Sequence, residues 1–376
     1  MKKSLRDIVF VFTVFVISRV FVAFGVFLGR KFLSFAPAFH DKVLESAWWE
    51  SLVRWDANFF TDVAINGYLY LPDGKTHNVG FFPLYPLLIR TINYFWKLPP
   101  TLIGIAVSNA FFLMALFLLY RYTKKYHPDS DPDLTTILMA FFPLGVFFSS
   151  IYSESLFLFL CLSSFFMFRK GKMIAAACAL FFVSMTRLAG IFVVGTIGWS
   201  YVFGKIAHSG NKGLDFKWRE LVTPLFWVLF SVSGCLLFLA YQQYAFGHWD
   251  AFILGQKAFH RHPIGSFSAL LSEMNLHPFN IMNLLPTGAV LGTSIIFLFL
   301  KDYRSYSLWG LLAVAVPLST GTFLSMSRYS MVFFPLVIYG SSLLTRIPLL
   351  RDITIMACSA ALVIFTALFV RIYFLG

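Results

Sequence analysis

Asp56 is the residue whose type and position in this chain point first to a chemical role. It lies in the stretch Arg54-Trp55-Asp56-Ala57-Asn58, a polar island in a sequence that is otherwise mostly apolar. At about 100° per residue, this stretch predicts a short amphipathic helix in which Asp56 falls on the apolar side. Because an uncompensated buried carboxylate is costly, Asp56 needs a basic partner, water or a substrate. The apolar side of the predicted helix also carries Leu52, Trp55, Phe59, Phe60 and Val63.

The opposite side of the same predicted helix is polar and needs no chemical explanation. Asp62 lies there, with Asn58 one turn away and Arg54 two turns away along a face that water can reach. We therefore expect Asp62 to have a structural role. Glycine commonly follows the last residue of a helix, so the pair Asn66-Gly67 predicts the helix end.

Three further charged residues stand alone between apolar runs. Arg187 and Arg328 are single charges at their turns, and Glu154 lies within Ser153-Glu154-Ser155. One buried acid with separate basic residues at a membrane boundary suits a substrate whose phosphate is attached to a lipid. Interfacial anchoring is the alternative for the two arginines, and a favourable position at a helix N-terminus is the alternative for Glu154.

The segment 247–282 adds Lys257 and Arg261 as candidates for contact with the same phosphate. His260 and His262 flank Arg261, but two histidines without a third ligand are weak grounds for a metal site. We expect this segment to be a loop that contacts lipid headgroups or water, and we expect no metal.

Composition places the chain among polytopic helical membrane proteins. Of 376 residues, 59% are hydrophobic, 12% are charged and 47 are phenylalanine, which argues against a soluble enzyme. The net charge of +13 comes from basic residues scattered between apolar runs, so membrane topology explains it better than nucleic-acid binding. The four cysteines all lie inside apolar runs and indicate neither a disulfide framework nor a zinc motif.

Apolar runs predict an all-α protein with about eleven transmembrane helices. The first span, Ile8 to Leu28, follows a basic N-terminus and lacks the cleavage site of a signal peptide. Arg19, near its middle, is either a functional candidate or a residue paired within the bundle. The other expected spans are 101–120, 134–150, 154–168, 173–186, 188–204, 221–246, 283–300, 307–323, 330–345 and 353–372.

The basic connectors between these runs predict the topology. The positive-inside tendency places them in the cytoplasm with the N-terminus, so that 29–100 and 247–282 are external loops of a single integral membrane domain, 1–376. The run Phe81 to Trp96 is apolar enough to cross, but counting it would place the basic residues after 120 outside. We prefer a re-entrant or interfacial helix within the first external loop, with twelve spans as the alternative.

Six sequence pieces, in this order along most of the chain, resemble the PIG-V family of mannosyltransferases and its prokaryotic relatives. The combination of the Trp-Asp segment with FFPLYP is fairly specific, whereas any single piece is weak. The pieces are WDANFFTDVAINGY, NVGFFPLYPLLIR, FFPLGVFFSSIYSESLFLFL, RKGK, TRLAGI and SMSRYSMVFFPL.

The resemblance implies a GT-C type glycosyltransferase that takes a sugar from a polyprenyl-phosphate donor and places it on a lipid- or glycan-linked acceptor hydroxyl outside the cytoplasm. In that class an acid in the first external loop is the expected catalytic group, and here it maps onto Asp56. The mechanism would be a single displacement with inversion, in which Asp56 is the general base and Arg187, Arg328, Lys257 or Arg261 stabilises the leaving phosphate. Glu154 is a further polar contact.

Neither a nucleotide nor a metal cofactor is expected, since the chain has no P-loop and no Asp-x-Asp pair. The compact chain with short cytoplasmic turns resembles the prokaryotic members, which implies a prokaryotic plasma membrane. The rival hypothesis is a transporter or flippase for an isoprenoid-linked or amphipathic substrate, although no internal repeat is visible. A noncatalytic membrane subunit is the third possibility.

Overall fold

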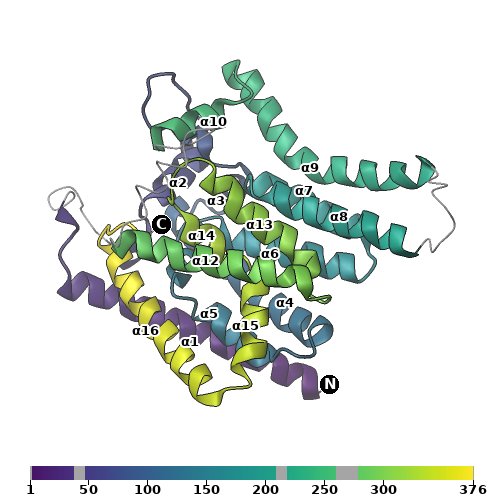
Figure 1. Cartoon of the computed structure of the whole chain (residues 1–376). Helices are drawn as coiled ribbons and strands as arrows, with labels where there is room; N and C mark the ends of the chain where they lie inside the picture. The colour runs from purple at the N-terminus through teal and green to yellow at the C-terminus, as the bar shows by residue number, and fades with distance from the viewer. Residues whose placement is uncertain (1, 38–46, 209–217, 260–277, 376) are drawn as a thin grey trace.

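The computed structural model describes residues 2–37, 47–208, 218–259 and 278–375, and within these ranges all regular structure is helical (Figure 1). The α-helices are α1 (Lys2–Phe32), α2 (Asp56–Asn66), α3 (Leu84–Trp96), α4 (Pro100–Tyr126), α5 (Pro132–Ala140), α6 (Glu154–Arg169), α7 (Met173–Thr186), α8 (Gly190–His208), α9 (Trp218–Phe246), α10 (Ala251–Gln256), α12 (Pro278–Phe299), α13 (Arg304–Leu318), α14 (Met326–Met331), α15 (Pro335–Leu344) and α16 (Pro348–Val370). Short 3-10 helices are η2 (Trp48–Leu52), η3 (Asn78–Gly80), η4 (Gly145–Phe148) and η5 (Lys257–Phe259).

Several of these helices are long and apolar enough to cross a bilayer, so the chain is a multi-pass integral membrane protein. The number of eleven spans is not confirmed, because other expected spans form shorter helices. In the described part of the chain, five helices meet the length and hydropathy of a span: Ser4–Phe32, Pro100–Tyr126, Val222–Phe246, Met282–Phe299 and Pro348–Val370.

Two expected spans are wrong as single helices, and proline is the physical reason for both. In the run 134–150 the α-helix ends at Ala140, shortly before Pro143, and the chain continues through turns and the short 3-10 helix η4. The run 330–345 is divided between α14 and α15, with Pro335 as the first residue of α15. Proline has no N–H for the helix ladder and its ring crowds the preceding turn, so each run breaks there.

The irregular segment between α5 and α6 runs through the middle of the protein. Residues 144–153 are all buried. Backbone that is not α-helical is tolerated within a membrane protein where other protein groups surround it and shield it from lipid. Arg19 of α1 reaches this segment, where its Nη1 donates to the Ser149 hydroxyl at 2.5 Å. The guanidinium also lies 4.7 Å from the centroid of the Phe112 ring. Arg19 is therefore paired within the bundle.

Helix α3, which forms from the run Phe81 to Trp96, has 13 residues and is only about 20 Å long. A single helix of that length does not cross a hydrocarbon core of about 30 Å. Its two faces differ: Tyr85 and Ile89 are fully buried, whereas Leu87, Arg90, Thr91 and Tyr94 are exposed. The helix is amphipathic, as the interpretation of a re-entrant or interfacial helix requires.

Helices α1 and α16 lie side by side (Figure 1) and approach closely through Gly25 and Gly29. A Cβ atom on Gly25 would lie 2.7 Å from Cβ of Thr366, and one on Gly29 would lie 2.5 Å from Cγ2 of Val370. This is the small-residue spacing that allows membrane helices to pack backbone against backbone. Residue numbers rise together along the contact, so the helices are parallel and both end near the chain segment that carries Asp56.

Candidate functional site

Helix α2 begins at Asp56, so the wheel that placed Leu52 and Asp56 in one continuous helix is wrong. Leu52 belongs to η2, and Trp55 interrupts the helical path with φ of 53° and ψ of −120°. Such a backbone conformation is strained for a non-glycine residue, and it turns the chain so that Asp56 starts a new helix. The predicted end is confirmed, because α2 stops at Asn66 and Gly67 follows with φ of 86°.

The partner that Asp56 requires is Arg328, which lies on α14. Nη1 of Arg328 is 2.5 Å from Oδ2 of Asp56, and Nε of the same guanidinium donates to Oε1 of Glu154 at 2.9 Å. Nη2 of Arg187 is 3.1 Å from that same Glu154 oxygen. The structure thus brings four of the residues singled out in the sequence into one connected cluster, which we call the acid–arginine cluster: Asp56, Glu154, Arg187 and Arg328.

Burial differs across the acid–arginine cluster. The Glu154 side chain is 0% exposed, Arg328 is 6% and Arg187 is 12%, whereas Asp56 is 25% exposed. Two acids and two arginines balance formally, which reduces the cost of taking these charges out of water. Asp56 is the more exposed of the two acids, and Glu154 is enclosed between the two guanidinium groups.

Two buried polar atoms of the cluster have no hydrogen-bond partner among the described residues. They are Oε2 of Glu154 and Nη1 of Arg187. Buried polar groups in native proteins normally find partners, so such atoms call for water or a bound molecule as the missing partner. An unpaired guanidinium N–H is a strong donor toward a phosphate oxygen.

Each charged side chain is placed by the end of a helix. Glu154 is the first residue of α6, where a negative charge is favoured by the helix dipole. Arg187 directly follows the last residue of α7 and has extended backbone. Arg328 lies on the short helix α14, which starts after Ser325 in the left-handed conformation with φ of 64°. Helix ends rather than helix faces therefore bring these groups together.

Sequence reasoning missed an aromatic residue that supports Arg328. The ring centroid of Tyr152 lies 4.6 Å from the Arg328 guanidinium, and the ring of Phe147 lies 5.3 Å from it. The Tyr152 hydroxyl donates to the backbone oxygen of Arg54 at 3.0 Å. Tyr152 thus connects the arginine with the chain segment that precedes Asp56, and its position two residues before Glu154 was the available signal.

The expectation that Arg54 is solvated beside Asp62 is wrong. Arg54 precedes α2, is only 7% exposed, and its Nε donates to the backbone oxygen of Val370 at 3.0 Å. Asp62 instead accepts hydrogen bonds from Asn66 at 2.7 Å and Asn78 at 2.5 Å. Arg54 therefore fixes the segment before Asp56 to the end of α16, a contact that a helical wheel does not contain.

The segment after α16 also lies against the site. The ring of Phe374 is 4.9 Å from that of Trp55, and the backbone oxygen of Leu375 accepts a hydrogen bond from the hydroxyl of Ser327 at 3.3 Å. Figure 1 shows this end of the chain beside α2 and α14. The residues that precede Asp56 and Arg328 are thus in contact with the same segment, which sequence patterns did not predict.

Lys257, the loop candidate that the structure describes, is not part of the acid–arginine cluster. Lys257 is an exposed residue of η5, and none of the ion pairs found in the described ranges joins it to Asp56 or Glu154. Arg261, His260 and His262 lie outside the described residues. Within residues 2–37, 47–208, 218–259 and 278–375, no group of three or more His, Cys, Asp or Glu side chains is arranged to hold a metal ion.

The fold and the cluster define a class of protein: a multi-pass helical membrane protein with two acids and two arginines gathered at one end of its bundle. The family model described as Mannosyltransferase (PIG-V) matches residues 4–258, and the chain belongs to this family. The resemblance seen in the sequence pieces is thereby confirmed.

Curated relatives and a solved structure are similar to this chain at low sequence identity. Human GPI alpha-1,6-mannosyltransferase 2 is 28% identical over 205 residues, covering 52% of this chain and 40% of the relative. GPI mannosyltransferase 2 of Schizosaccharomyces pombe is 30% identical over 158 residues, covering 41% of this chain and 32% of the relative. The matched region spans less than half the length of these relatives. An Archaeoglobus fulgidus oligosaccharyltransferase in complex with Zn and sulfate gives a TM-score of 0.48 at 11% identity over 96% of this chain and 53% of that chain.

Proposed function

We propose that this chain is a membrane glycosyltransferase that moves a hexose, mannose by its family, from a polyprenyl-phosphate donor to a hydroxyl of a lipid- or glycan-linked acceptor. The observation that carries the proposal is the acid–arginine cluster, in which a reachable carboxylate is connected through buried charges to an arginine with an unpaired N–H. The names of the relatives, GPI mannosyltransferases, support the sugar and the reaction class.

Asp56 is assigned as the general base. Its side chain is 25% exposed, and Arg328 holds Oδ2 in place, so the carboxylate is both accessible and oriented. The acceptor oxygen attacks C1 of the sugar while Asp56 takes the hydroxyl proton. The new C1–O bond forms as the bond between C1 and the phosphate oxygen breaks, and its electron pair leaves with the polyprenyl phosphate. The configuration at C1 inverts in this single step.

Arg187 is assigned to the phosphate of the donor. The leaving phosphate gains charge as the C1–O bond breaks, and a preorganised guanidinium in a buried site stabilises that charge strongly. Nη1 of Arg187 is free of partners among the described residues, whereas Nε, Nη1 and Nη2 of Arg328 all contact carboxylates. Arg328 is therefore assigned to positioning Asp56 and Glu154. Lys257 and Arg261 stay as further candidates for contact with the phosphate.

The setting of the reaction is part of the proposal. We place the cluster on the non-cytoplasmic side of a prokaryotic plasma membrane, with the N-terminus in the cytoplasm, because the connectors rich in Lys and Arg then face the cytoplasm. The chemistry assigned to these residues requires no nucleotide and no metal cofactor. Partners of the chain are the donor lipid, the acceptor and the surrounding membrane lipids.

The test is sugar transfer by the full chain reconstituted in liposomes with a tritiated mannosyl polyprenyl phosphate and a membrane lipid extract as the source of acceptor. Wild type should label a glycolipid with inverted C1 configuration, and Asp56→Asn should lower the rate by about 10²- to 10⁴-fold. Arg187→Gln should lower it by about 10²- to 10³-fold. Asp73→Asn, in an exposed loop at an acid paired with His77, is the matched control and should keep the rate.

Three results would decide against the proposal. Transfer by a correctly inserted Asp56→Asn variant at the wild-type rate would remove the general base. Label that crosses the bilayer while still attached to its donor, with no glycolipid formed, would support the flippase instead. Retention of the donor configuration in the product would exclude the single displacement.

A further inference from the structure

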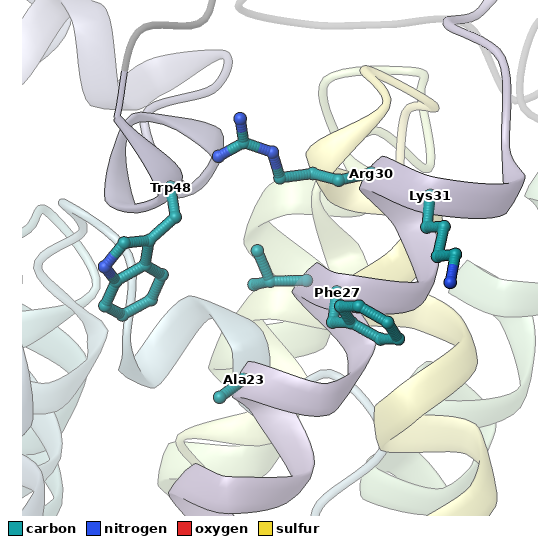
Figure 2. A pocket seen from close by; sticks show the side chains of 6 residues that line it. Ala23, Phe27, Arg30, Lys31 and Trp48 are labelled. Carbon is teal, nitrogen blue, oxygen red and sulfur yellow. The ribbon is translucent and has the colours of Figure 1, made fainter.

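A groove of about 700 Å³ opens between the last turns of α1 and the segment that carries Trp48. Figure 2 shows Arg30 reaching from α1 toward the Trp48 segment, with Ala23 and Phe27 on the turns before it. Pockets for small molecules commonly have roughly 300 to 1,000 Å³, so this groove is of the right size to hold part of a lipid. Its lining residues are Ala23, Val26, Phe27, Arg30, Lys31 and Trp48.

The lining changes from apolar to basic along α1. Ala23, Val26 and Phe27 supply an apolar wall, while Arg30 and Lys31, one turn later, are the charged members of the lining and are both positive. An apolar wall that ends in two cations matches a molecule with a hydrocarbon chain and an anionic head.

The position of the groove along α1 matches the boundary of a bilayer. The 21 residues from Ile8 to Leu28 extend about 31 Å, close to the roughly 30 Å thickness of a hydrocarbon core. Arg30 and Lys31 then lie at the level of the headgroups, and the exposed Trp48 ring is of the type that gathers at this interface. A phosphate at Arg30 would leave an acyl chain beside Ala23 and Phe27.

We infer that this groove binds one anionic phospholipid of the leaflet at the site end of the bundle. The phosphate would contact Arg30 and Lys31, and one acyl chain would lie between α1 and Trp48. The choice of a phospholipid over the sugar donor rests on the proposed function, because the phosphate of the donor must lie beside Asp56 and Arg187. Arg30 and Lys31 therefore suit the phosphate of a lipid that takes no part in the sugar transfer.

Hydrogen bonds connect the groove with Arg54, two residues before Asp56. Trp48 belongs to η2, whose Glu50 backbone oxygen accepts from Nη1 of Arg54 at 3.0 Å. Arg54 also donates to Val370, and the guanidinium of Arg371 donates to the backbone oxygen of Gly29 at 2.8 Å. A lipid held between α1 and Trp48 would therefore stabilise the position of η2 and of the turn that leads into α2.

The inference can be tested by native mass spectrometry of the full chain, with phosphatidylglycerol and phosphatidylcholine as the probes. Wild type should retain phosphatidylglycerol in preference to phosphatidylcholine by about tenfold or more. Replacing both Arg30 and Lys31 by Gln should lower phosphatidylglycerol retention by roughly 10- to 30-fold, since each basic residue near a charged lipid contributes about one kcal/mol. The readout involves no sugar transfer, so it can fail while the proposed activity stands.

A second variant and a control make the result specific to this groove. Ala23 is exposed, so Ala23→Trp should fold and fill the apolar wall, and it should lower retention of both lipids. The matched control replaces Arg346 and Arg351 by Gln; both lie by the start of α16, at the opposite end of the α1–α16 pair. It should leave the preference for phosphatidylglycerol unchanged.

Three outcomes would overturn the inference. One is equal retention of the two lipids by wild type. Another is a control that loses as much phosphatidylglycerol as the Arg30 and Lys31 variant, which would indicate general surface charge. The third is displacement of phosphatidylglycerol by an equimolar amount of polyprenyl monophosphate, which would assign the groove to the donor.

Discussion

Nη1 of Arg328 lies 2.5 Å from Oδ2 of Asp56, although 272 residues separate the two in the chain. The same guanidinium donates to Glu154 through Nε at 2.9 Å, so one arginine bridges both acids. Burial alone lowers the pKa of Arg328, but the carboxylates of Glu154 and Asp56 raise it, and the net result is a pKa well above the usual value. The bridge is therefore charged throughout the physiological range of pH.

The first prediction concerns the geometry of that bridge. Arg328→Lys keeps the positive charge but replaces a planar group with several donors by a single ammonium, which cannot hold both carboxylates in the same way. We expect the rate of sugar transfer to fall by about 10²-fold or more, because Asp56 loses its fixed orientation. The measurement is the transfer rate together with the melting temperature of the purified chain.

The comparison that identifies the cause is Arg328→Gln. This variant removes the charge as well, so it should also destabilise the protein, whereas Arg328→Lys should lose more activity than stability. Equal activity of the Lys variant and wild type would show that orientation of Asp56 by Arg328 has no part in the reaction.

A second prediction follows from the complete burial of Glu154 between two arginines. Glu154→Gln leaves the guanidinium groups of Arg187 and Arg328 without their shared counter-charge. Removing one partner from a buried ion pair costs about 3 to 5 kcal/mol, so we expect a clear loss of stability in detergent unfolding. Asp352→Asn, at an exposed acid paired with Arg351, is the control and should change stability by less than about 1 kcal/mol.

Sequence patterns predicted those parts of the site that depend on local chemistry. The end of α2 at Asn66 followed from Gly67, and the need of Asp56 for a partner followed from the cost of burying a carboxylate. Arg187 and Arg328 were found as the only charges at their turns, Glu154 as an acid between two apolar runs, and Asp56 as an acid on the apolar side of a predicted helix. Hydropathy and charge are properties of short segments, and that is why these predictions were within reach.

The parts that sequence patterns missed depend on backbone conformation and on contacts between distant segments. The start of α2 is set by the strained backbone of Trp55, which no residue preference indicates. The aromatic support of Arg328 by Tyr152 joins segments far apart in the chain. The two wrong spans were predicted from hydropathy, which does not register that Pro143 and Pro335 interrupt the hydrogen bonding of a helix.

A third prediction compares two helix glycines. A Cβ at Gly29 would lie 2.5 Å from Cγ2 of Val370 and 2.6 Å from the backbone oxygen of Ala367, so Gly29→Ala must push α16 away from α1. Overpacking of this kind costs about 1 to 3 kcal/mol. Because Val370 also accepts the hydrogen bond of Arg54, we expect the transfer rate to fall together with the melting temperature.

The matched control for Gly29 is Gly292→Ala in α12. A Cβ there would meet no atom within 4 Å, so the only effect is the better helix propensity of alanine. The melting temperature should stay the same or rise slightly. A rise of similar size for Gly29→Ala would show that the two helices are not in close contact at this point.

The last prediction concerns pH and a histidine far from the acid–arginine cluster. His127 follows the last residue of α4, is 3% exposed, and its Nε2 lies 3.0 Å from the hydroxyl of Tyr306. Burial, with a smaller contribution from the positive charge of Arg169, lowers the pKa of His127 from 6.5 to about 4. Between these two values the unfolded chain binds a proton that the folded chain does not, so stability falls as the pH drops from 6.5 toward 4. From pH 7 to pH 5 the loss from this group should be about 2 kcal/mol.

Unfolding of the purified chain at pH 7 and at pH 5 tests this assignment. His127→Gln has no group that titrates in this range, so its stability should change less between the two pH values than that of wild type, by about the amount assigned to His127. His248→Gln replaces an exposed histidine and should keep the wild-type pH dependence. The same loss in wild type and His127→Gln would mean that other groups, and not His127, cause the sensitivity to acid.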